Sequence, residues 1–133
     1  MTTAAQARLN GFYDEIVRRS YSGACNHWCS TLPHLEDSNG VLLTPPRGGY
    51  VREDFLAAWP RLSETVGPAF VLDRQAVERA FTRILKLDSD ITLSDDVRHH
   101  LHLAEQEADD IALRDGHVNL IVQIAVFGRI VFG

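Results

Sequence analysis

The chain has 133 residues, of which 45% are hydrophobic and 23% charged, and its net charge is −5, a composition typical of a globular domain. This length is enough to bury a core without disulfides or metal, and no apolar stretch reaches the roughly 18 residues that a membrane span needs. The N-terminal residues have no apolar signal-peptide core, so we expect one cytoplasmic domain over residues 1–133, without membrane association.

The first predicted element is an amphipathic helix over residues 4–19, whose apolar side chains recur on one face. Residues 20–50 are then rich in glycine and proline and predict a long irregular segment, which in a compact domain is often functional. Within it, Asn39-Gly40 favours a hairpin turn between residues 32–37 and 41–44.

Helical spacing returns over residues 51–66, where the proline after Trp59 predicts either two short helices or one helix kinked at Trp59. Asp73 is a favourable N-cap for a helix that extends to residue 87. Ser94 is a favourable N-cap for a further helix, with apolar positions on its buried face as far as Ile111.

The most apolar run lies at residues 117–133, and its periodicity fits a buried strand or a buried helix. Its many valines and isoleucines, and the turn-forming pair Asp115-Gly116 before it, favour a strand. We therefore predict an α+β fold, mainly helical with about four helices, and a small antiparallel sheet from this C-terminal segment. The alternative is an all-α fold with residues 117–127 as a buried helix.

The negative charge is concentrated in one part of the chain. Residues 88–115 contain nine acidic and two basic side chains, a net of −7, while the remaining residues carry +2. Six of the carboxylates are predicted to contact a partner, and these are Asp95, Asp96, Glu105, Glu107, Asp109 and Asp110. An acidic surface of this kind attracts basic partners and repels nucleic acid.

A first candidate metal site combines Cys25, His27, Cys29 and His34, all of which are residue types that bind zinc. These four residues crowd within ten positions, whereas structural zinc sites pair their ligands on separated loops. We therefore favour a loop with reduced, buried cysteines and expect no bound cofactor.

A second candidate lies within residues 99–110, where helical spacing puts His99, His102 and Gln106 on one face and also brings His102, Glu105 and Asp109 close together. Histidine and carboxylate side chains can bind a divalent metal, but one helix supplies only part of such a site. A solvated acidic helix face is the interpretation that we favour.

Two hypotheses for function follow from these observations. The favoured one is a small acidic binding module that inhibits or modulates a protein with a basic, nucleic-acid-binding surface, without binding nucleic acid itself. Small acidic anti-defence inhibitors of phages and mobile elements share this size and charge. The alternative is a metal-dependent enzyme that uses residues 99–110 or the Cys/His cluster at 25–34. The sequence leaves homo-oligomerisation open.

Overall fold

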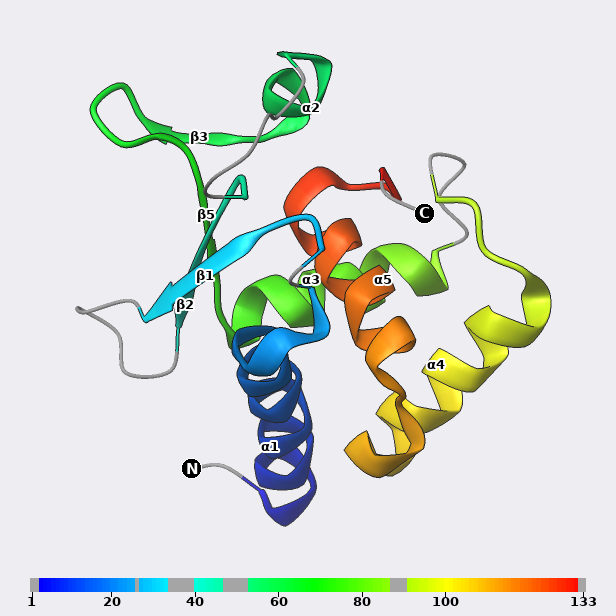
Figure 1. The fold of residues 1–133 in the computed structure, drawn as a ribbon. Helices are drawn as coiled ribbons and strands as arrows, with labels where there is room; N and C mark the ends of the chain where they lie inside the picture. Colours follow the sequence, from blue (N-terminus) through cyan, green and yellow to red (C-terminus); the bar gives the residue numbers. More distant parts are fainter. Residues whose placement is uncertain (1–2, 26, 34–39, 47–52, 87–90, 132–133) are drawn as a thin grey trace.

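The computed structural model describes residues 3–25, 27–33, 40–46, 53–86 and 91–131 (Figure 1). In chain order its elements are α1 (Ala4–Arg19), the π-helical turn η1 (Ser20–Ala24), β1 (Ser30–Pro33), β2 (Val41–Thr44), α2 (Glu53–Ala58), β3 (Arg61–Ser63), β4 (Gly67–Pro68), β5 (Phe70–Leu72), α3 (Arg74–Leu85), α4 (Asp95–Glu107), the 3-10 turn η2 (Asp110–Ala112) and α5 (Asp115–Phe127). Helices and two small antiparallel sheets are both present, which confirms the α+β class.

The C-terminal apolar run is a helix, α5, so our prediction of a strand over residues 117–127 is wrong and the helical alternative holds for this segment. The helix packs against α3, η1, β5 and α1, and its buried side chains are Val118, Ile121, Val122, Gln123, Ile124 and Val126. A helix that is apolar on most sides belongs in a core. The preference of valine and isoleucine for strands is weak, and burial between other elements overrides it.

The residues at both ends of α5 also show why the prediction of a strand was wrong. Asp115 and Gly116 lie in the first turn of the helix instead of a hairpin turn, and the backbone N–H of Arg114 donates to His117 Nδ1 at 3.0 Å. At the other end Gly128 adopts φ +73° and its N–H donates to the Ile124 carbonyl at 2.9 Å. A left-handed glycine is a common helix terminator, so the glycine after this apolar run marks a helix end.

Helices α1 and α3 also contribute to the core. The prediction of a helix over residues 4–19 is confirmed, and Phe12, Tyr13 and Ile16 of α1 are buried. The Phe81 ring of α3 lies 5.6 Å from the Phe12 ring and 6.0 Å from the Tyr13 ring, centroid to centroid. Tilted aromatic contacts at this spacing add to the stabilisation from burial, and they hold α1 against α3.

The larger sheet has the strand order β1-β2-β5 and is antiparallel throughout. It arises from the region that we expected to be irregular and from residues before α3, and not from the C-terminal segment. Strands β1 and β2 form the predicted hairpin, although β1 begins earlier than expected and Pro33 pairs with Val41. Asn39 lies outside the described residues, and Gly40 directly precedes β2.

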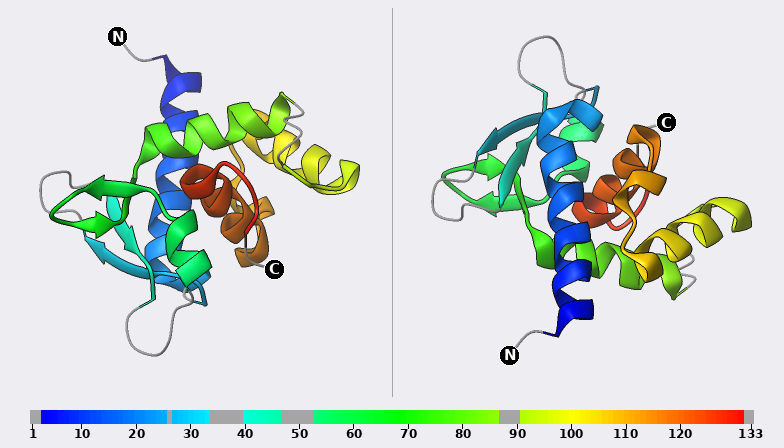
Figure 2. Two further views of the ribbon diagram at one scale, coloured as in Figure 1. Left: turned by 90° about the horizontal axis from the view of Figure 1, so that it is seen from above. Right: turned by 90° about the horizontal axis from the view of Figure 1, so that it is seen from below.

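The helical prediction for residues 51–66 holds only in its first half. Helix α2 ends at Ala58, just before Trp59 and Pro60. This end is expected because Pro60 has no backbone N–H to donate to a helical hydrogen bond. The second predicted helix is instead the two-stranded sheet of β3 and β4. This sheet and α2 lie at one side of the molecule, and α4 lies at the opposite side (Figures 1 and 2).

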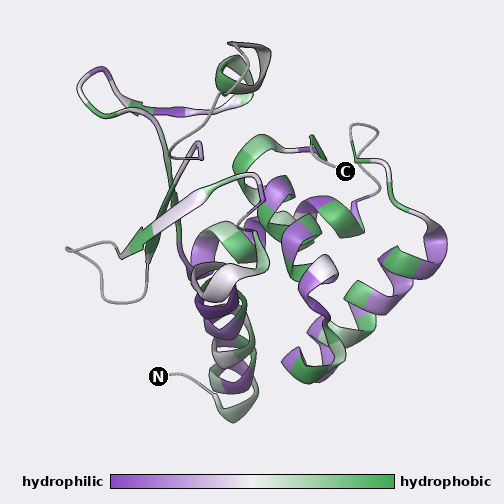
Figure 3. Ribbon diagram, in the orientation of Figure 1, coloured by the Kyte–Doolittle hydropathy of each residue, from purple (hydrophilic) through white to green (hydrophobic). Residues whose placement is uncertain are grey.

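The helix starts at Asp73 and Ser94 are confirmed. The Asp73 carboxylate accepts from the Ala76 N–H at 2.9 Å, and the Ser94 hydroxyl accepts from the Val97 N–H at 3.2 Å. Polar and apolar residues alternate around α1 and α4, as expected for helices with one solvated face (Figure 3). Among the described residues, no helix has the length and apolar character needed to cross a membrane.

Candidate functional site

The six predicted acidic contact residues do not form one surface. Asp95 and Asp96 are exposed in the first turn of α4, and the other four lie at its last turn and in the segment that follows. At 1.5 Å per residue, the eleven steps from Asp96 to Glu107 separate these two residues by roughly 17 Å along the helix. Two separate groups of carboxylates therefore have to be considered.

Glu105 is not a free surface carboxylate. It is partly buried, and its Oε2 accepts a hydrogen bond of 2.8 Å from the Tyr13 hydroxyl of α1. Burial raises the pKa of Glu105 above its ordinary value, and the Tyr13 hydrogen bond opposes that shift. Burial, followed by the bond to Glu105, likewise raises the pKa of Tyr13. The pair joins α1 to α4, which gives Glu105 a structural role.

The remaining three carboxylates surround the point where α4 ends. Ala108 takes a left-handed conformation, φ 50°, and the Asp109 N–H then donates to the Ala104 carbonyl at 2.9 Å. Glu107 is exposed, while Asp109 and Asp110 are partly buried. Among the described residues, none of these three carboxylates has a salt bridge or a side-chain hydrogen bond.

Arginines of α1 approach this end of α4 but bind its backbone. Arg8 donates to the Glu107 carbonyl at 3.5 Å, and Arg19 donates to the Asp110 carbonyl at 3.2 Å and the Leu113 carbonyl at 2.7 Å. The Arg19 guanidinium also forms a salt bridge of 2.8 Å with Asp115. These contacts hold the segment after α4 in place and leave the three carboxylates available.

Ile111 directly follows Asp110 in the chain and is 89% exposed. Our sequence interpretation placed it on the buried face of α4, which is wrong because the helix ends at Glu107 and the chain changes direction at Ala108. Residues 110–112 form the turn η2 instead of a continued helix. We call Glu107, Asp109, Asp110 and Ile111 the acidic edge.

Of the Cys/His cluster, the described structure brings the two cysteines together and leaves His27 apart from them in exposure. Cys25 and Cys29 are buried free thiols and the Cys29 Sγ donates to the Cys25 carbonyl at 3.3 Å, whereas His27 is exposed. The contact with Cys29, together with burial, raises the pKa of Cys25. The fourth predicted ligand, His34, lies outside the described residues.

The second candidate metal site is divided as well. His99 and His102 line a hollow of about 370 Å³ beside Asp95, whereas Glu105 faces Tyr13 and Asp109 lies beyond the helix end. The His102 Nδ1 is buried without a hydrogen-bond partner in the described structure. Across the described ranges, no group of three or more His, Cys, Asp or Glu residues is arranged to hold a metal ion.

Two features were not found from the sequence. The His100 and His117 rings stack at 4.6 Å between centroids and join α4 to the start of α5, but no spacing rule links these positions. The other feature is a hollow between α3 and α5, which Arg79 and Arg83 of α3 border. Their four-residue spacing puts both on one helix face, which was the available signal.

Comparison of the chain with protein-family models, curated proteins and solved structures gives no match.

Proposed function

We propose that this protein is a binding module that recognises a basic protein surface through the acidic edge. The observation that carries the proposal is an isoleucine with 89% of its surface exposed, which follows within four residues of the chain three carboxylates without described side-chain partners. The pairing of an apolar centre with a charged rim resembles the composition of protein interfaces more than that of a solvated helix face.

The energetic argument concerns what a partner would add. A buried isoleucine side chain contributes about 1.5–3 kcal/mol, and Ile111 is almost fully solvated in the free protein. Burial beneath a partner would therefore yield most of this free energy. Hydrogen bonds from arginine to carboxylates such as those of Glu107 and Asp109 are charge-assisted and stronger than neutral ones.

The same charges define the class of partner. The chain has a net charge of −5, and residues 88–115 alone carry −7. Such negative charge steers association toward positive surfaces and away from phosphate backbones. A protein that uses a basic surface to hold nucleic acid would present guanidinium and ammonium groups to this edge. Carboxylates bound to that surface would compete with the phosphates of the nucleic acid. The module would thereby inhibit or modulate nucleic-acid binding by its partner.

The experiment is affinity capture from an extract of the cells that make the protein, with the wild-type chain and two variants immobilised in parallel. Ile111→Ser removes the apolar centre of the acidic edge. Val66→Ser is the matched control, because Val66 is an exposed aliphatic residue, at 53%, in the β3–β4 turn on another part of the surface.

We expect a protein with a basic surface to be retained by the wild type and by Val66→Ser, and to be depleted at least tenfold with Ile111→Ser. Tenfold corresponds to about 1.4 kcal/mol, the lower end of the isoleucine contribution. Equal retention by Ile111→Ser, or retention only of acidic proteins, would contradict the proposal.

A further inference from the structure

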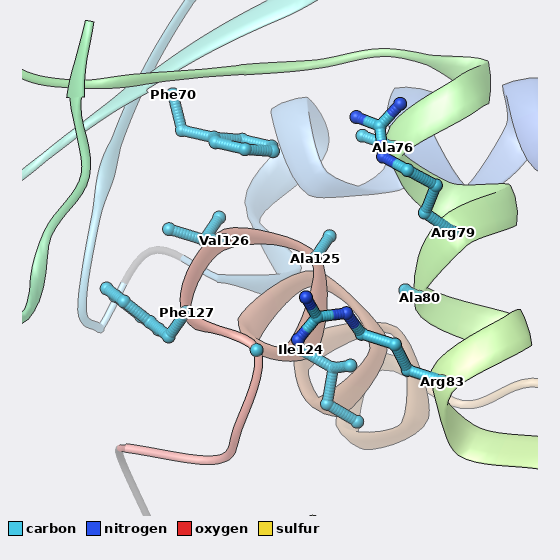
Figure 4. A pocket seen from close by; sticks show the side chains of 10 residues that line it. Phe70, Ala76, Arg79, Ala80, Arg83, Ile124, Ala125, Val126 and Phe127 are labelled. Carbon is cyan, nitrogen blue, oxygen red and sulfur yellow. The ribbon is translucent and has the colours of Figure 1, made fainter. Parts of the chain in front are cut away.

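A second feature lies away from the acidic edge, in a hollow of about 260 Å³ between α3 and the last turn of α5 (Figure 4). Its lining includes Phe70 of β5 together with Ile124 and Phe127 of α5. Arg79 and Arg83 extend from α3 beside these side chains (Figure 4). A concave apolar surface with a few convergent polar groups is the usual form of a small-ligand site.

The two arginines are exposed, and neither has a carboxylate partner among the described residues. By contrast, Arg18, Arg19 and Arg74 each form a salt bridge with an acidic side chain. Arg79 and Arg83 are four residues apart, so their guanidinium groups start from one face of α3. The hollow therefore combines apolar side chains in its lining with two positive charges.

The two arginines carry more positive charge than is needed to balance the negative end of the α5 helix dipole. A helix C-terminus carries the equivalent of roughly −0.5 elementary charge, whereas two arginines supply +2. Arg83 lies close to that end, since a Cβ placed on Gly128 would be 2.5 Å from its Nη1. The excess positive charge is available to an anion.

We infer that this hollow binds a small amphipathic carboxylic acid, with its carboxylate held by Arg79 and Arg83 and its apolar part against Phe70 and Phe127. The planar guanidinium matches the geometry of a carboxylate and can donate two parallel hydrogen bonds. The volume of about 260 Å³ falls just below the usual range of roughly 300–1,000 Å³, which favours a ligand smaller than a typical drug. The presence of Phe70 and Phe127 in the lining favours an acid with a short hydrocarbon tail over a bare inorganic anion.

The test is an NMR titration of the ¹⁵N-labelled full chain with hexanoate, hexanamide, acetate and inorganic phosphate at constant ionic strength. Hexanamide lacks the charge, acetate lacks the tail, and phosphate supplies charge alone. We expect saturable shifts at the Gly128, Ala80 and Ala125 amides with hexanoate, and binding at least about tenfold weaker for the other three compounds. Equal binding of hexanamide, tighter binding of phosphate, or no saturation with hexanoate would overturn the inference.

Variants separate ligand binding from support of the helix end. Arg79→Gln and Arg83→Gln should each weaken hexanoate about tenfold, as expected for loss of a charge-assisted hydrogen bond, while the exposed Arg61→Gln should leave it unchanged. Gly128→Ala keeps both charges but displaces the Arg83 guanidinium, so it should also weaken hexanoate. Unchanged affinity in both arginine variants would show that these side chains only stabilise α5.

Discussion

The bond between Tyr13 and Glu105 is expected to stabilise the attachment of α4 to α1. The Tyr13 side chain is 3% exposed and its hydroxyl donates to the Glu105 carboxylate at 2.8 Å. A hydrogen bond to a charged group contributes about 1.5–3 kcal/mol, and a neutral one about 0.5–1.5 kcal/mol. Tyr13→Phe should therefore lower the free energy of unfolding by about 1.5–3 kcal/mol in the wild type, and by about half of that in a Glu105→Gln background.

The assay is urea unfolding of the wild type, both single variants and the double variant, which together form a double-mutant cycle. Glu107→Gln is the control, since this exposed residue is two positions further along the chain and its substitution should cost less than about 0.5 kcal/mol. The reasoning is refuted if Tyr13→Phe costs the same in both backgrounds, or if Glu107→Gln costs as much as Glu105→Gln.

The pH dependence of the same pair has a defined sign. Burial raises the folded-state pKa of Glu105 above its ordinary value of 4.5, so the folded state binds a proton more readily than the unfolded state. The contribution of Glu105 to stability is therefore complete below pH 4.5 and declines as the pH rises through the folded pKa. This decline should be absent in Glu105→Gln when unfolding is measured across that range.

Three further predictions concern the core, a histidine pair and a thiol. Phe81→Ala should destabilise the fold by about 3–5 kcal/mol, whereas Leu85→Ala, at a residue 38% exposed on the same helix, should cost about 1 kcal/mol or less in urea unfolding. Burial, and secondly the charge of the stacked His100, lower the pKa of His117 in the folded state. The contribution of His117 to stability should therefore be complete above its ordinary pKa of 6.5 and should be lost as the pH falls below that value. His117→Gln should reduce this dependence of stability on pH, and a flat profile in the wild type would contradict the prediction. Cys25 is fully buried, so it should react with a thiol reagent only after unfolding, and rapid labelling of the native protein would refute its burial.

Local signals in the sequence were sufficient for the helices that begin at a polar cap. Asp73 and Ser94 each bond to an N–H of the first helical turn, and such bonds depend only on residues within one turn. The spacing of apolar residues over 4–19 was likewise enough to place α1 and its buried face. These elements could be predicted because their determinants are adjacent in sequence.

The elements that were missed depend on distant residues. Whether residues 117–127 form a strand or a helix is decided by the surrounding α1, α3 and β5, because the run is apolar in either conformation. Strand β5 exists through its pairing with β2, where Val71 lies opposite Leu42. A three-residue strand has too little local signal to be recognised without its partner.

The candidate site could be predicted only in part, because it also depends on residues that are distant in the sequence. The concentration of charge in residues 88–115 is a property of the sequence, but the burial of Glu105 requires Tyr13, which is 92 residues away along the chain. The exposure of Ile111 follows from the left-handed conformation of Ala108, a non-glycine residue that gives no sequence signal for it. The acidic edge therefore emerges only when the end of α4 is seen in three dimensions.

The most direct test of the proposed function is the association rate of the captured basic partner, measured by stopped flow at low and physiological salt. Glu107→Gln/Asp109→Asn neutralises the acidic edge, and Asp95→Asn/Asp96→Asn neutralises the other end of α4, roughly 17 Å away and beyond the ~8 Å screening length at physiological salt. We expect the first variant to associate several-fold more slowly at low salt, with a smaller effect at high salt, and the second to associate at the wild-type rate. Equal rates for both variants and the wild type at low salt would contradict binding through the acidic edge.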